Sequence, residues 1–169
     1  MSSEADAGPA PGLSSEQFRR TCAHFPTGVA IASVMDRQGI PHGLTVNSFT
    51  SVSLDPPLIL ICLGHEVTSI DIFRAASHFA INILGEDQRE ISTRFARQGQ
   101  GRFDGLEWRR GEFGAPLLAG VLAEIECALY RRIPVGDHDI LIGEMLRGRV
   151  HKGEPLVYYG SRYRQLAPA

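Results

Sequence analysis

Closely coupled β-rich segments constrain the fold of this chain more than any other feature. They are separated by short turns containing Gly or Pro, such as the turn at 37–40. Short turns join antiparallel neighbours, whereas a doubly wound parallel sheet needs a long crossover between its strands. We therefore expect six or seven mostly antiparallel strands, within residues 27–36, 41–49, 57–63, 78–84, 121–135, 138–151 and 156–166.

Three segments with helical periodicity are placed among these strands. The first can begin at Ser14 or Ser15, because either residue is a suitable N-cap. The helices are expected over 14–25, 68–78 and 86–98. The predicted fold class is mainly β with peripheral α-helices, arranged as a small antiparallel barrel. The wholly apolar segment 57–63 is expected to be a strand buried on both faces.

Length and composition favour one domain. The 169 residues are 43% hydrophobic, which is enough for a single core. Residues 1–13 are rich in Ala, Gly, Pro and Ser, so they are expected to be a disordered tail before one domain over 14–169. The formal net charge of -2 provides no basic surface for nucleic acid.

The cysteines and the apolar segments indicate the cellular compartment. Cys22, Cys62 and Cys127 are an odd number and lie far apart, so we expect small buried side chains rather than a disulfide framework. The residues before the first helix do not show the basic segment and apolar core of a signal peptide, so none is expected, and no apolar run approaches the roughly 18 residues of a membrane span. A cytoplasmic protein that does not contact the membrane is expected.

A polar ribbon runs directly into the apolar strand in "HGLTVNSFTSVSLDPPLIL", residues 42–60. Its hydroxyl and amide side chains could hold an anionic or heteroaromatic ligand by hydrogen bonds alone. Ser and Thr are also common on the solvent face of ordinary strands, so this alternative remains open. The polar side chains are Thr45, Asn47, Ser48, Thr50, Ser51 and Ser53.

Two further positions are candidates for ligand contacts. Thr68 and Ser69 begin a helix after an apolar strand, where free N–H groups can bind phosphate; an ordinary N-cap is the alternative. In "VGDHDILIG", His138 shares a strand face with Gly136, and the flanking Asp137 and Asp139 could fix its tautomer. A purely structural hydrogen bond is the alternative for this histidine.

Several site classes are disfavoured by spacing. Gly99, Gly101 and Gly105 do not form a dinucleotide-binding fingerprint after a strand, and no phosphate-binding P-loop motif is present. A tight Cys–His pair such as Cys22 and His24 does not by itself supply the four ligands of a zinc site, so no metal site is expected.

Taken in order, these stretches resemble the flavin reductase-like family of the FMN-binding split barrel. Its members include the reductase components of two-component flavin-dependent monooxygenases. The resemblance runs from "FPTGVAIAS" through "GLTVNSFTSVSLDPPL" and "RFARQGQGRFDGLEW" to "GDHDILIGEM", and covers nearly the whole chain. It implies a Greek-key-like, homodimeric split β-barrel. Such a protein reduces FMN, or FAD, with NADH or NADPH and delivers the reduced flavin to an oxygenase.

The resemblance also implies residue roles. Thr45, Asn47 and Ser48 would face the flavin ring and ribityl chain, while Ser69 and Arg102 would bind the phosphate. His138 would be the catalytic residue, positioned at the nicotinamide. The implied cofactor-binding residues are Thr27, Thr45, Val46, Asn47, Ser48, Ser51, Cys62, Leu63, Gly64, Ser69, Arg102, Phe103, Gly136, Asp137 and His138.

Two other functions remain compatible with the same barrel. A flavin carrier or sensor would keep the ribbon and Ser69 but would not need the "GDH" residues. An enzyme that acts on another small molecule with FMN as a prosthetic group would need charged substrate-binding residues near these motifs, and the sequence has none there.

Overall fold

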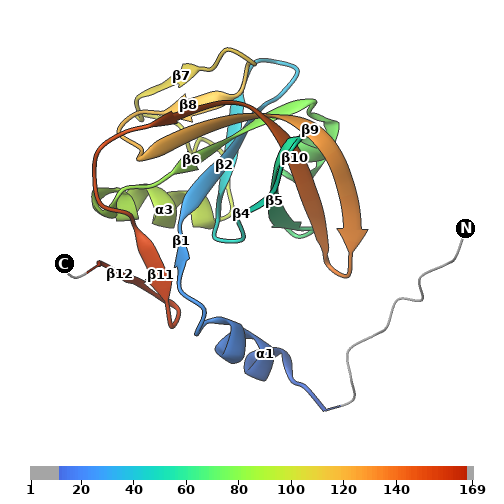
Figure 1. Ribbon diagram of the computed structural model, residues 1–169, viewed down its shortest axis with the longest axis vertical. Helices are drawn as coiled ribbons and strands as arrows, with labels where there is room; N and C mark the ends of the chain where they lie inside the picture. Colours follow the sequence, from blue (N-terminus) through green and yellow to red (C-terminus); the bar gives the residue numbers. More distant parts are fainter. Residues whose placement is uncertain (1–11, 167–169) are drawn as a thin grey trace, which may run out of the picture.

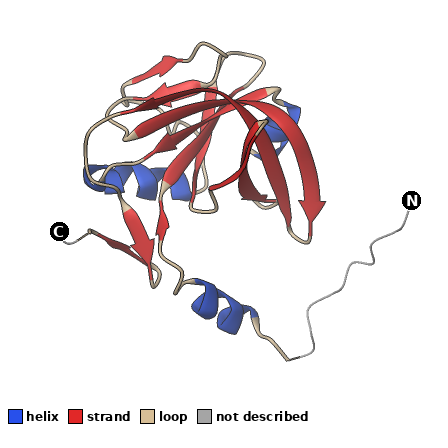
Figure 2. Cartoon of the chain, viewed as in Figure 1, coloured by secondary structure: helices blue, strands red, loops and turns tan. Residues whose placement is uncertain are grey.

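The computed structural model describes residues 12–166 and consists mainly of antiparallel β-structure (Figures 1 and 2). The predicted fold class is therefore confirmed. The predicted tail, 1–13, lies almost entirely outside the described residues, as does 167–169 of the predicted domain. Seven strands form the main sheet in the order β3-β2-β6-β9-β10-β5-β4. They are β2 (Ala30–Met35), β3 (Pro41–Val46), β4 (Thr50–Leu54), β5 (Pro57–Gly64), β6 (His78–Ile83), β9 (Ala123–Val135) and β10 (His138–Val150).

Five short strands complete the β-structure of the described residues, so the expected total of six or seven is too low. Strands of two or three residues are too short to show an alternating pattern in sequence. One small sheet contains β1 (Thr27–Gly28), β11 (Val157–Tyr159) and β12 (Arg162–Arg164), and the other contains β7 (Trp108–Arg110) and β8 (Pro116–Leu118).

The polar ribbon forms the seam of the barrel. β3 and β4 lie at opposite edges of the seven-stranded sheet, yet only residues 47–49 join them. Three residues span at most about 11 Å, so the two edges approach each other and the sheet curls into a split barrel. Ser48 fastens this seam, because its Oγ accepts a hydrogen bond of 2.9 Å from the backbone N–H of Cys62.

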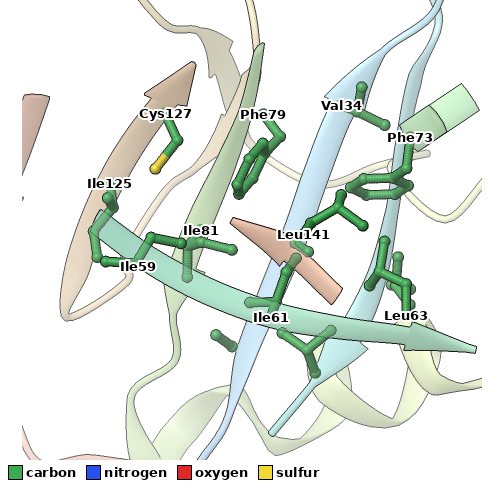
Figure 3. Close-up of a cluster of buried hydrophobic side chains, with 14 of the residues drawn as sticks. Val34, Ile59, Ile61, Leu63, Phe73, Phe79, Ile81, Ile125, Cys127 and Leu141 are labelled. Carbon is green, nitrogen blue, oxygen red and sulfur yellow. The ribbon is translucent and has the colours of Figure 1, made fainter. Parts of the chain in front are cut away.

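The barrel interior holds the main hydrophobic core (Figure 3). Ile61 and Leu63 of β5 are fully buried there, beside Phe79 and Leu141. The alternate residues of β5 are only half-buried, so the expectation of a strand buried on both faces is wrong. β5 pairs antiparallel with both neighbours, and an antiparallel sheet can leave one face partly open to solvent.

All three predicted helices are present, although each is shorter than expected. They are α1 (Ser15–Cys22), α2 (Ile70–Ala75) and α3 (Arg89–Ala96), with a 3-10 helix, η1 (Glu86–Gln88), before α3. Ser14 is the N-cap of α1 and forms a reciprocal capping box with Gln17. No helix among residues 12–166 is long and apolar enough to cross a membrane.

The helix α1 lies apart from the barrel (Figure 1) and buries none of its residues within the described chain. Phe18 is 57% exposed, and Phe25, just beyond the helix, is 76% exposed. The expectation that all cysteines are buried is therefore wrong for Cys22, which is exposed on this helix, and Cys62 is only half-buried. Cys127 lies in the core, where burial raises the pKa of its thiol to about 12.

Candidate functional site

Three buried polar atoms lack a hydrogen-bond partner among residues 12–166. They are Thr27 Oγ1, Ser69 Oγ and Arg102 Nε. Leaving a buried donor or acceptor unpaired costs about 1 to 3 kcal/mol, so such groups are rare and require an explanation. All three residues belong to the set that the sequence resemblance assigns to flavin binding. A bound polar ligand would supply the missing partners.

Ser69 and Arg102 line one cavity of about 410 Å³. Its walls come from the β2–β3 hairpin, the start of α2 and the loop at 99–104. This volume is within the usual range for small-molecule sites. Ser69 is at the N-cap position of α2 and is 4% exposed, but its hydroxyl does not cap the helix. The hydroxyl therefore remains available for a ligand in the cavity.

Arg102 is held against the cavity wall by β3. Its Nη1 donates a hydrogen bond of 2.6 Å to the carbonyl oxygen of Gly43. Burial lowers the pKa of the Arg102 guanidinium below its ordinary value, because desolvation disfavours the charged form. An anion in this cavity would favour the charged form again, so the site is suited to a phosphate group.

His138 lies where β10 meets β5. It pairs across the sheet with Gly64, and a Cβ atom at Gly64 would lie 3.6 Å from His138 Nε2. The His138 Nδ1 is 2.7 Å from Asp137 Oδ1, and this hydrogen bond lowers the pKa of Asp137. No hydrogen bond to His138 Nε2 is present within residues 12–166, and the side chain is 49% exposed. Nε2 is thus free to contact a ligand.

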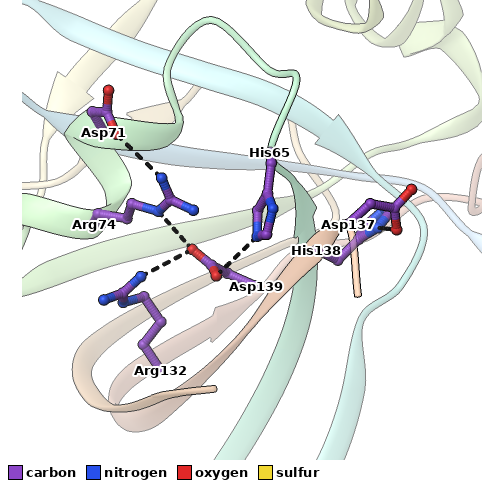
Figure 4. Close-up of polar contacts among 7 residues, drawn as sticks. All are labelled: His65, Asp71, Arg74, Arg132, Asp137, His138 and Asp139. Carbon is purple, nitrogen blue, oxygen red and sulfur yellow. Dashed lines mark hydrogen bonds and ion pairs between the residues drawn. The ribbon is translucent and has the colours of Figure 1, made fainter. Parts of the chain in front are cut away.

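The sequence also predicts that Asp139 could fix the His138 tautomer, and this prediction is wrong. Successive side chains of a strand point to opposite faces, so Asp139 points away from His138. It is fully buried and accepts hydrogen bonds from Arg74, Arg132 and His65 instead (Figure 4).

The other candidate residues fall into separate groups. Thr27, Val46 and Asn47 line a groove of about 280 Å³ beside Phe25. The Ser48 hydroxyl is bonded to Cys62 at the seam. Ser51 is exposed on β4 and Gly136 is exposed in the β9–β10 turn.

Three candidates have side chains that are already engaged. Thr45 Oγ1 donates a hydrogen bond of 2.6 Å to the carbonyl oxygen of Ser92 in α3. Leu63 is in the core, so only its main chain could reach a ligand. Phe103 lines the cavity but also packs edge-on against Phe95, with ring centroids 4.9 Å apart.

Sequence reasoning missed part of the cavity wall. Asp36, Gln38 and His42 of the β2–β3 hairpin line it, and His42 Nε2 is 3.0 Å from Asp36 Oδ2. The only sequence signal here was a turn at 37–40, and a turn does not reveal which distant loop it faces.

A split barrel with unpaired polar groups around a nucleotide-sized cavity defines the class of flavin-binding barrels. Within that class, this chain belongs to the family described as "Flavin reductase like domain", which matches residues 22–167. The resemblance found in the sequence is confirmed.

Individual relatives match almost the full chain. The actinorhodin polyketide dimerase of Streptomyces coelicolor is 42% identical, over 90% of this chain and 86% of its own length. The FMN reductase (NADH) SmoA of Agrobacterium fabrum is 41% identical over the same shares. The solved NADH:FAD oxidoreductase SgcE6 of Streptomyces globisporus C-1027, in complex with NAD and FAD fragments, superposes with a TM-score of 0.86. It is 40% identical, over 90% of this chain and 93% of that chain. Other relatives are described as the reductase component of a flavin-dependent trigonelline monooxygenase and as the flavin reductase component of a bacterial two-component tryptophan halogenase.

Proposed function

We propose that this protein is an NAD(P)H:flavin oxidoreductase that reduces FMN, or FAD, by hydride transfer and supplies the reduced flavin to a partner monooxygenase. One observation carries the proposal. The three residues with unpaired buried polar atoms, Thr27, Ser69 and Arg102, are also residues that the family resemblance assigns to flavin binding. The relatives named as FMN and FAD reductases support the same activity.

The residues present fit a flavin nucleotide. Ser69 and Arg102 would hold its phosphate, while Thr27 and Asn47 would donate hydrogen bonds along the groove beside the seam. Thr45 would contribute through its main chain, because its hydroxyl is bonded to Ser92. When bound, the flavin supplies the ring that accepts a hydride from reduced nicotinamide.

Hydride transfer requires the protein to position the nicotinamide and flavin rings, and it does not require a nucleophilic side chain. His138 would orient the nicotinamide nucleotide through the free Nε2, with Asp137 holding the opposite ring nitrogen. The barrel strands would exclude water from one side of the reacting rings. Orientation and water exclusion lower the barrier without any further reactive side chain.

A flavin that acts as a substrate must leave the protein, and this separates the proposal from a carrier or a tightly bound flavoprotein. Gel filtration is expected to strip flavin from the purified protein, and added FMN is expected to restore NADH oxidation. Flavin that stays bound, with no effect of added FMN on the rate, would favour the prosthetic-group alternative. Retained flavin without NADH oxidation would favour the carrier.

We also propose a cytoplasmic homodimer. The exposed Phe18 of α1 and the exposed Phe25, which lines the Thr27 groove, support a two-fold partner, since closed symmetric dimers are the commonest oligomers. The three free cysteines support a reducing compartment.

Light scattering is expected to give about twice the chain mass of 18.5 kDa. Replacing Phe18 with Glu should shift the protein toward monomer, because a charge would be buried in the interface. The control is Leu54→Glu, which changes another exposed apolar residue, on β4. A stable, fully active wild-type monomer would contradict the dimer.

A further inference from the structure

A buried carboxylate near the start of β10 connects this strand to β9, to α2 and to the segment between β5 and α2 (Figure 4). Asp139 Oδ2 accepts hydrogen bonds of 2.7 Å from Arg74 Nε in α2 and 3.2 Å from Arg132 Nη1 in β9. Asp139 Oδ1 is 3.1 Å from His65 Nε2, in the segment between β5 and α2. The Asp139 side chain is 0% exposed, whereas its three partners extend to the surface.

Packing alone does not explain a charged carboxylate at this buried position. A buried charge loses hydration free energy, and an apolar side chain of similar size often gives equal or greater stability. Asp139 pairs with Leu63 on β5 and with Pro134 on β9, and Leu141 follows it on the same face of β10, so the surroundings are otherwise apolar. Arg74, more than the other partners, lowers the pKa of Asp139 to about 2, so the carboxylate is ionised at neutral pH.

The partners of Asp139 place it between the two parts of the candidate site. Arg74 lies in the short helix that follows Ser69, the residue on the cavity side. His65 is held a second time, because its backbone N–H donates a hydrogen bond of 2.9 Å to the carbonyl oxygen of Asp137. The segment from His65 to Arg74, which contains Ser69, is therefore tied at both ends to Asp139 of the strand that carries His138.

We propose that Asp139 is a positioning residue that holds the β5–α2 segment against β10. It thereby fixes the position of Ser69 relative to His138. This inference rests on the proposed function. Asp139 touches neither ligand; it acts through His65 on one side and Arg74 on the other. One substitution at Asp139 should therefore disturb both flavin binding and nicotinamide binding, whereas a substitution at Ser69 or His138 should disturb only one.

The test is Asp139→Asn in the full chain, which keeps the side-chain shape and removes the charge. The Kd for FMN, from quenching of flavin fluorescence, and the KM for NADH are each expected to rise about three- to tenfold. The matched control is Glu124→Gln, which removes another buried carboxylate bonded to an arginine, Arg109. Glu124 lies far along β9 from Pro134, the residue of β9 that pairs with Asp139. The Glu124→Gln variant should have a lower melting temperature, with the Kd for FMN and the KM for NADH unchanged.

A second variant separates positioning from folding. His65→Gln changes a partly exposed side chain, and its effects should be much less than additive with those of Asp139→Asn, because both break one connection. Folded Asp139→Asn with unchanged Kd and KM would overturn the proposal, as would additive effects. If Asp139→Asn does not fold, unchanged constants in His65→Gln would overturn it. A wild-type protein that binds FMN but does not oxidise NADH would refute the proposed function instead, and the FMN constants would still decide the role of Asp139.

Discussion

Replacing Arg102 with methionine is expected to weaken FMN binding about 30-fold, which corresponds to roughly 2 kcal/mol for lost hydrogen bonds to a charged group. Methionine keeps much of the apolar stem but removes the guanidinium from the cavity wall. Riboflavin lacks the phosphate, so its affinity should change much less. Titrating flavin fluorescence for both ligands measures the difference.

Two further variants make this result specific. Ser69→Ala removes the hydroxyl that faces the same cavity and should weaken FMN binding by about 1 to 2 kcal/mol, again more than riboflavin binding. Arg97→Met removes an exposed arginine that does not line the cavity, and should leave both affinities unchanged. Equal losses for FMN and riboflavin would remove Arg102 and Ser69 from the phosphate site.

Replacing His138 with alanine is expected to raise the KM for NAD(P)H about tenfold, with the FMN affinity nearly unchanged. The imidazole stands beside Gly64, and its Nε2 is free, so it can orient the nicotinamide nucleotide. If the imidazole also stabilises the transition state, kcat will fall as well. Steady-state kinetics on protein shown to be folded by circular dichroism separates the two contributions.

The alternative for His138 is a structural role at the strand end. In that case the variant would lose thermal stability while KM and kcat of the folded fraction stayed at wild-type values. His151→Ala is the matched control, because His151 is a similarly exposed histidine just after β10 and its nearest charged partner, Glu124, is 3.8 Å away. It should leave the kinetic constants unchanged.

Much of the fold could be predicted from the sequence because the patterns that mark its longer strands and its helices lie within short segments of the chain. Alternating apolar residues and short turns define β2, β3, β9 and β10, and an N-cap serine, Ser14, marks the start of α1. The three-residue strands β7 and β8 lack such a pattern, and β4 also lies outside the expected strands. The pairing of β1 with β11 joins residues far apart in the sequence, so no local pattern could reveal it.

The candidate site also contains residues that could be predicted from the sequence and contacts that could not. Ser69, Arg102 and His138 could be named because a family resemblance links motifs that lie far apart in the chain. The contact between Arg74 and Asp139 could not, because it joins residues 65 positions apart and Arg74 belongs to none of these motifs. The same holds for the placement of Asp36 and His42 at the cavity, which depends on the path of the 99–104 loop.

The central claim is that this protein transfers a hydride from NAD(P)H to flavin. The most direct measurement is nicotinamide absorbance under anaerobic conditions, with flavin-free protein and either FMN, FAD or no flavin. The account predicts oxidation of NADH or NADPH only when flavin is present, with one flavin reduced for each nicotinamide oxidised. No loss of nicotinamide absorbance with either nucleotide at saturating FMN and FAD would contradict it.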